Sequence, residues 1–267
     1  MLIDTHCHLD APEFDDNRDL IIARARAGGV GAMIVPAVSP HNFDTVAALA
    51  HTHSDIVYAL GIHPLWVDRL TDDALQLLEQ ALVSRRGDPK LVAVGEIGLD
   101  YFVPGLDVAR QEVFYEAQLL LARSFDLPVI LHVRKSQDRL LKYLRKTSVS
   151  GGIAHAFNGS TQQARAFTEL GFALGFGGTL TFERARQIRR LVGELPGEAH
   201  VLETDAPDMA PAWLARERNE PGELPAIARQ FAQLRTASLD EVIEQTYCNA
   251  LRVIPGLKCI HRPPPVA

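Results

Sequence analysis

Short apolar, β-branched runs recur along the chain at fairly even spacing, and each is followed by a segment whose apolar residues have a helical period. This alternation is typical of parallel βα units, in which strands buried on both faces are covered by helices. The runs predict eight strands, at residues 2–9, 32–38, 55–62, 91–99, 128–134, 152–157, 172–180 and 200–206.

The segments between the runs predict amphipathic helices. They lie at residues 18–27, 43–51, 74–85, 109–124, 136–145, 162–170, 184–191 and 224–234, with an added terminal helix at 239–251. Parallel strands covered on both faces could form an open doubly wound sheet or a closed barrel. Eight repeats favour an α/β fold of the (β/α)8 TIM-barrel type, and the Gly-x-Gly-x-x-Gly motif of nucleotide-binding open sheets is missing after the first strand.

A chain of 267 residues matches the usual size of one such barrel, so a second domain is not required. The composition, 47% hydrophobic and 22% charged, is that of a globular protein with a sizeable core. We expect one barrel domain at residues 1–255, including the added C-terminal helix, and a Pro-rich C-terminal tail at residues 256–267.

The formal net charge of −6, without a block of basic residues, argues against tight, sequence-independent binding of duplex DNA. A phosphate substrate stays open, because bound metal ions would add positive charge. The three scattered cysteines resemble neither a disulfide framework nor a zinc motif, which favours a reducing compartment. The chain begins without a leader and has no apolar run long enough to span a membrane, so we predict a cytoplasmic protein.

Polar residues gather where the predicted strands end, which is where barrel enzymes form their active sites. His6 and His8 lie two residues apart on a predicted strand, so both imidazoles would project from one face while Cys7 points toward the helices. His51 and His53 have the same spacing, but they fall at the end of a predicted helix, where such residues do not share a face.

Other strand ends carry further ligand-type side chains. A single buried histidine is more often a hydrogen-bonded structural residue than a ligand. Four histidines and two carboxylates at one edge of a barrel, however, form a ligand set suited to Zn²⁺, Mn²⁺ or a similar divalent ion. The predicted metal ligands are His6, His8, Glu96, His132, His155 and Asp205.

The strand-end motifs also resemble those of a known family. They are Asp-Thr-His6-Cys-His8-Leu, Gly-Ile-His63-Pro, Gly-Glu96-Ile-Gly-Leu-Asp-Tyr, Leu-His132-Val-Arg, His155-Ala-Phe and Glu-Thr-Asp205-Ala-Pro. In order and approximate spacing, across nearly the whole chain, they look like the TatD family of metal-dependent deoxyribonucleases, within the amidohydrolase-like barrel superfamily. One departure is Leu65, where many members of that family have a second histidine after His63-Pro64.

The resemblance implies two divalent ions per subunit, Zn, Mn or Mg. One ion would be held by His6, His8 and Asp205, the other by His132 and His155, with Glu96 bridging both. It also implies a deoxyribonuclease that cleaves phosphodiester bonds of single-stranded or end-accessible DNA.

Two metal ions can activate a hydroxide and polarise the substrate oxygen, and a carboxylate that touches metal and water can take up the proton. We assign that catalytic role to Asp205; the alternative is a purely structural ligand. His63 and Arg134 are the predicted substrate-binding residues, because they offer hydrogen-bond donors at the same rim, and Lys135 is a weaker candidate.

Asp4 and Glu203 each precede a ligand by two residues, on strands that become neighbours when the barrel closes. We expect both carboxylates to face the interior and to hold ligand imidazoles or basic side chains. Two other functions remain open: an ester or amide hydrolase of a small substrate or aminoacyl ester that uses the same metal site, and a non-catalytic metal-binding scaffold.

Overall fold

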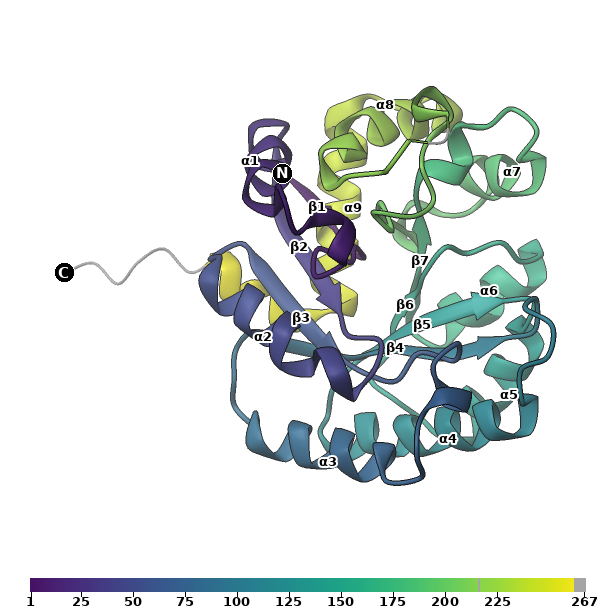
Figure 1. The fold of residues 1–267 in the computed structure, drawn as a ribbon. Coiled ribbons are helices and arrows are strands. Elements are labelled where there is room, and N and C mark those ends of the chain that lie inside the picture. The colour runs from purple at the N-terminus through teal and green to yellow at the C-terminus, as the bar shows by residue number, and fades with distance from the viewer. Residues whose placement is uncertain (216, 262–267) are drawn as a thin grey trace.

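The computed structural model describes residues 1–215 and 217–261, and its eight strands form one parallel sheet in which each strand pairs with the next along the chain (Figure 1). The predicted (β/α)8 barrel is therefore confirmed. The strands are β1 Leu2–Asp4, β2 Val30–Pro36, β3 Ile56–Leu60, β4 Leu91–Asp100, β5 Val129–Arg134, β6 Gly152–Ala154, β7 Phe172–Phe176 and β8 His200–Leu202.

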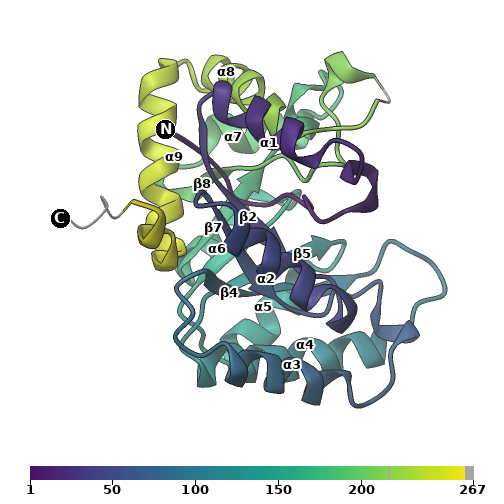
Figure 2. The same ribbon diagram turned by 60° about the vertical axis from the view of Figure 1, so that its left-hand side comes forward.

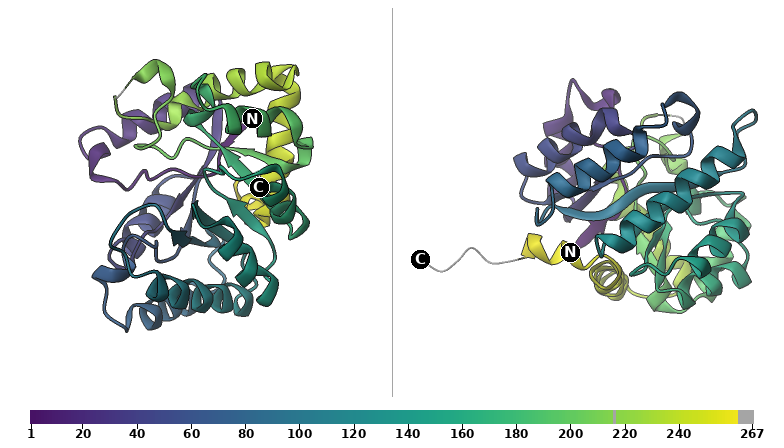
Figure 3. Two further views of the ribbon diagram at one scale, coloured as in Figure 1. Left: turned by 90° about the vertical axis from the view of Figure 1, so that its right-hand side faces the viewer. Right: turned by 90° about the horizontal axis from the view of Figure 1, so that it is seen from below.

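Helices surround the strands on the outside (Figures 2 and 3), and each predicted helix is present with its ends shifted by a few residues. They are α1 Arg18–Ala27, α2 Phe43–Thr52, α3 Ala74–Ser84, α4 Val108–Ser124, α5 Gln137–Lys146, α6 Thr161–Glu169, α7 Arg186–Glu194, α8 Leu224–Arg235 and α9 Leu239–Val253. None of the helices in the described residues is both long and apolar enough to cross a bilayer.

The barrel closes between its first and last strands through hydrogen bonds that continue beyond the strands themselves. Thr5 N donates to Leu202 O at 3.1 Å, and Asp205 N donates to His6 O at 2.8 Å. The predicted strands at 2–9 and 200–206 were therefore too long, because β1 ends at Asp4 and β8 at Leu202. Beyond those points the chain turns inward, so the two segments that close the barrel also carry ligand-type side chains into its mouth.

Two apolar layers make up the core. The larger lies between the sheet and the helices and includes Cys7, as predicted for a side chain that faces outward. The smaller lies inside the barrel, and α9, the yellow helix at the left of Figure 2, packs against it. Its members from the strands are Ile3, Ala32, Ile34, Val57, Ala59, Val92, Ala93, Ile130, Ile153, Ala173 and Val201. One end of the barrel is thus closed by apolar residues, which leaves the carboxyl ends of the strands for polar chemistry.

The predicted C-terminal tail begins inside the packed structure. Residues Pro255–His261 form a 3-10 helix, and Leu257 is fully buried against the apolar floor of the barrel. Residues 262–267 lie outside the described part of the chain, so the boundary between barrel and tail at residue 255 stays a prediction.

Candidate metal centre

The six predicted ligands converge at the carboxyl ends of the strands. Glu96 lies on β4 and His132 on β5, whereas the other four follow the ends of β1, β6 and β8. His6 and His8 were predicted to share the face of a strand; instead they lie in the loop after β1, yet their Nε2 atoms are only 3.2 Å apart. Loop geometry, rather than strand alternation, brings the two imidazoles together.

Glu96 occupies the centre of this group, with its side chain only 2% exposed. Its Oε2 atom lies 3.1 Å from Nε2 of His6 and 3.6 Å from Nε2 of His8. Its other oxygen, Oε1, lies 2.9 Å from Nδ1 of His132 and 3.4 Å from Nε2 of His63. Each carboxylate oxygen therefore faces a different pair of imidazoles.

Asp205 also faces this group, from a left-handed backbone with φ of 58°. Its Oδ1 atom lies 3.6 Å from Nε2 of His6, and its Oδ2 atom lies 3.7 Å from Nε2 of His155. The rings of His6 and His155 stack with their centroids 3.8 Å apart. Three sets of side chains in the described residues could hold a metal ion: His6 with His8 and Glu96, His6 with His155 and Asp205, and His63 with Glu96 and His132.

This grouping differs only in part from the one that the family resemblance implied. The implied set of His6, His8 and Asp205 also lies together, because Nε2 of the two imidazoles is 3.6 Å and 3.8 Å from Oδ1 of Asp205. His155 lies with His6 and Asp205, while its ring centroid is 6.5 Å from that of His132. His63, which we assigned to substrate, lies beside His132, with its Nε2 3.0 Å from Nδ1 of that ring. His63 follows β3, which is the neighbour of β4 in the sheet, so its ring reaches Glu96 from the adjacent strand.

Two buried carboxylates hold ligand imidazoles from behind. Asp100 Oδ2 accepts a hydrogen bond from Nε2 of His132 at 3.0 Å, which leaves Nδ1 directed at Glu96. Glu203 Oε1 lies 3.0 Å from Nδ1 of His155 and also accepts from the backbone N–H of Ala156 at 2.6 Å. Because a carboxylate only accepts, these contacts select the tautomer whose other ring nitrogen is free to bind a cation.

Glycine makes room for one of these supports. A Cβ atom on Gly175 of β7 would lie 2.1 Å from Oε2 of Glu203, so a side chain at that position would displace the Glu203 carboxylate. The prediction that Glu203 holds an imidazole is therefore supported by its contacts, whereas the same expectation for Asp4 was wrong. The Asp4 carboxylate accepts instead from the Thr204 hydroxyl at 2.6 Å and the Thr204 N–H at 3.0 Å, and so ties β1 to the segment after β8.

Asp100 was quoted in a motif but received no role from the sequence. The signal that could have found it is alternation, because residues 96, 98 and 100 of β4 share one face. The Asp100 carboxylate is completely buried, and its hydrogen bonds hold its pKa at about 2 against the opposing effect of burial. Asp100 thus carries a permanent negative charge directly behind His132.

The centre is electrostatically negative. Burial disfavours a charged imidazole at His8, but the hydrogen bond and charge of Glu96 outweigh it and raise the pKa of His8 to about 9. Burial is likewise outweighed at His155, whose pKa rises to about 10 beside Glu203 and Asp205. The pKa of Asp205 itself rises to about 6, mainly through burial. A site that draws protons this strongly onto imidazoles also favours metal cations.

His63 behaves differently from the other imidazoles. Burial is the main cause that lowers its pKa to about 4, so the ring is neutral at pH 7. The backbone N–H of Leu65 donates to its Nδ1 at 3.1 Å. The proton of the neutral ring therefore resides on Nε2, which makes His63 a hydrogen-bond donor toward the centre.

The sequence matches a known protein family and several of its members. A family model described as TatD related DNase matches residues 3–255. The chain is 41% identical over 243 residues to the uncharacterised metal-dependent hydrolase YjjV of Escherichia coli K12, covering 91% of this chain and 93% of the relative. It is 35% identical over 259 residues to the 3'-5' ssDNA/RNA exonuclease TatD of Cronobacter turicensis, covering 94% and 97%.

The fold agrees as well. The crystal structure of Escherichia coli YjjV, described as a TatD homologue, matches with a TM-score of 0.91 at 39% identity, over 95% of this chain and 98% of that one. The family resemblance read from the strand-end motifs is thus confirmed. The chain belongs to the TatD-related DNase family and is a metal-dependent hydrolase.

Proposed function

We propose that this protein hydrolyses phosphodiester bonds at single-stranded ends of nucleic acid, using two divalent metal ions. The observation that carries the proposal is the placement of Glu96, whose two oxygens face two different imidazole pairs within one buried cluster. A carboxylate so placed is suited to bridge two cations, and paired cations serve phosphoryl chemistry. The relative from Cronobacter turicensis, named as an exonuclease of single-stranded DNA and RNA, supports the same substrate class.

The donor set fits divalent ions. Imidazole nitrogens and carboxylate oxygens suit Zn²⁺ and Mn²⁺, and Mg²⁺ remains a third choice where carboxylates predominate. We propose that His6, His8, His132, His155, Glu96 and Asp205 hold the ions. Bound ions would polarise the phosphoryl oxygen and lower the pKa of the attacking water.

Asp205 is the proposed proton acceptor. Its side chain is 14% exposed, against 2% for Glu96, so of these two carboxylates it is the one that water can reach from the mouth. A base must lie within hydrogen-bond reach of the proton that it removes. Glu96, enclosed by imidazoles on both oxygens, is left to bridge the ions.

His63 and Arg134 are the proposed substrate contacts. The Nε2–H of His63 points into the centre and can donate to a phosphoryl oxygen, because a neutral imidazole brings a donor without a competing positive charge. Arg134, at the end of β5, has its side chain 48% exposed and lies further out at the mouth. The inner contact would then orient the reacting phosphate, and the outer one would hold the strand.

A substrate panel tests the proposal. The metal-loaded protein should shorten single-stranded DNA or RNA labelled at its 3' or 5' end one nucleotide at a time. Blunt duplex DNA should be degraded more slowly, since the net charge of −6 provides no general attraction for a duplex. Rapid cleavage of aryl esters or amides without any phosphodiester hydrolysis would contradict the proposal and favour the alternative hydrolase. Binding of metal without hydrolysis of any of these substrates would favour a scaffold.

A further inference from the structure

An exposed aromatic side chain stands beside the metal centre. Phe102 follows the end of β4 by two residues, and 49% of its surface is exposed. A single exposed apolar residue is ordinary on a protein surface. Phe102 is unusual in its neighbours, because two cations at the end of β5 lie against its ring.

Arg134 and Lys135 provide those cations. The guanidinium carbon of Arg134 lies 4.0 Å from the centroid of the Phe102 ring, and Nζ of Lys135 lies 4.8 Å from it. The pair Arg86 and Phe125, near the ends of α3 and α4, has one cation at 5.1 Å instead. Both positive charges therefore lie at the mouth of the barrel, although the chain as a whole is acidic.

Asp100 joins this surface rigidly to the metal centre. Its Oδ1 atom accepts from the backbone N–H of Phe102 at 2.8 Å and of Val103 at 3.0 Å. Its Oδ2 atom accepts from His132 and lies 3.9 Å from Nη1 of Arg134. One buried carboxylate therefore contacts the backbone of Phe102, the Arg134 guanidinium and a ligand imidazole.

We propose that Phe102, Arg134 and Lys135, here called the Phe102 platform, form a subsite for one nucleotide of a single strand. The nucleobase stacks on the ring and on the guanidinium plane, and the adjoining phosphate takes donors from Arg134 and Lys135. Exposed aromatic rings combined with cations along a backbone track are how proteins hold single strands without reading sequence. This subsite rests on the proposed function, since it holds the strand whose phosphodiester the metal centre cleaves.

Stacking is tested with oligonucleotides that carry one abasic residue, moved stepwise away from the cleaved end. For the wild-type holoenzyme, one position of the abasic residue should raise KM by about 5-fold to about 150-fold, the range expected for one lost base stack. Phe102→Leu should raise KM for the intact strand by a similar factor and should no longer distinguish the abasic strand. Phe102→Trp should keep the discrimination, and Phe125→Leu is the matched control at a distant arginine–aromatic pair.

The role of the two positive charges is tested by measuring how tightly the protein binds a single strand, rather than how fast it cleaves one. In an Asp205→Asn background, anisotropy of a labelled single strand gives the dependence of log K on log salt concentration. Arg134→Gln and Lys135→Gln should each reduce the magnitude of this slope by about 0.7, the value for one lost phosphate contact in single-stranded nucleic acid. Arg86→Gln should leave the slope unchanged.

Three outcomes separate this subsite from the proposed function. Hydrolysis that is insensitive to an abasic residue at every position overturns the subsite and leaves the nuclease in place. A Phe102→Leu enzyme that loses kcat at unchanged KM also overturns it, because the ring would then only support Asp100 and His132. Absence of nucleic acid hydrolysis by the wild-type holoenzyme overturns the proposed function itself.

Discussion

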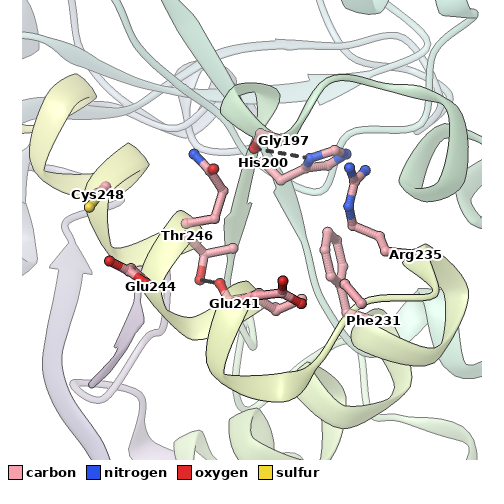
Figure 4. A pocket seen from close by; sticks show the side chains of 11 residues that line it. Gly197, His200, Phe231, Arg235, Glu241, Glu244, Thr246 and Cys248 are labelled. Atoms are coloured by element: carbon pink, nitrogen blue, oxygen red, sulfur yellow. Dashed lines mark hydrogen bonds between the residues drawn. The ribbon is translucent and has the colours of Figure 1, made fainter.

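Within the described part of the chain, buried histidines occur in two regions, and their surroundings have opposite character. At the mouth of the barrel, His155 is 4% exposed and lies between two carboxylates. Near the start of β8, His200 is 1% exposed and borders a hollow of about 520 Å³ between α8 and α9 (Figure 4). Burial is nearly equal in the two places.

The charges around the two rings decide the difference. Burial lowers the pKa of His200 to about 4, with the Arg235 guanidinium as a second cause, whereas carboxylates overcome burial and raise that of His155 to about 10. Phe176 and Phe231 pack edgewise or tilted against the His200 ring, with centroids 5.3 Å and 5.2 Å away. A buried histidine thus indicates a cation site only where buried carboxylates accompany it.

The largest expected effect that tests this comparison is loss of metal. Among the motifs, no Ser-His-Asp or Cys-His nucleophile offers a metal-independent route, so chelation should abolish hydrolysis completely. Re-addition of Zn²⁺, Mn²⁺ or Mg²⁺ should restore it to different extents. The measurement is single-strand cleavage before and after dialysis against a chelator, with metal content determined in parallel. Full turnover by metal-free protein would contradict a metal mechanism.

Glu96→Gln should have the next largest effect, because one substitution weakens charge compensation at both imidazole pairs. Asp100→Asn is the matched comparison: it keeps the six ligands and changes the support behind His132 together with the contacts to Phe102 and Arg134, and about a 10- to 100-fold loss is typical for a lost ligand support. Glu96→Gln should lose more than Asp100→Asn in both metal content and kcat/KM. Equal losses would mean that Glu96 does not bridge.

Asp205→Asn keeps the shape of the side chain but removes the proposed base and one negative charge. We expect kcat to fall by at least about 10²-fold, the usual contribution of acid–base help, while KM changes less. Steady-state kinetics on a single-stranded oligonucleotide measure both constants. A large rise in KM at constant kcat would instead assign Asp205 to substrate binding.

The smallest effect concerns His200 and appears in stability rather than activity. The pKa of His200 in the folded state is about 4, below the ordinary value of 6.5. Its contribution to the free energy of unfolding is therefore fully present above pH 6.5. As the pH falls from 6.5 to 4, the unfolded chain binds a proton at this histidine, whereas the folded protein does not. This costs about 3 kcal/mol of unfolding free energy.

His200→Gln should flatten that part of the pH profile in urea unfolding without changing nuclease activity. His51→Gln is the control, since the side chain of His51 is 54% exposed at the end of α2. A pH profile identical to that of the wild type in His200→Gln would show that other groups cause the acid sensitivity.

Much of the fold could be predicted because each element depends on local pattern. Apolar runs and helical periods located the strands and helices to within a few residues, with the largest errors where β1, β7 and β8 end. The ends of β1 and β8 were misplaced because the segments with His6 and Asp205 resemble continuing strands, yet only irregular hydrogen bonds join them where the barrel closes. The local hydrophobic pattern of a segment does not indicate that the barrel closes there.

The sequence by itself determined the order of the elements, the barrel class and the residue types available at the strand ends, since periodicity and chemical identity are properties of the chain. Only the tertiary structure decided which atoms meet. It paired each Glu96 oxygen with different imidazoles, placed Asp100 behind His132, and let Gly175 make room for Glu203. These contacts join strands far apart in sequence, and their geometry follows from barrel closure and packing, which act on the whole chain at once.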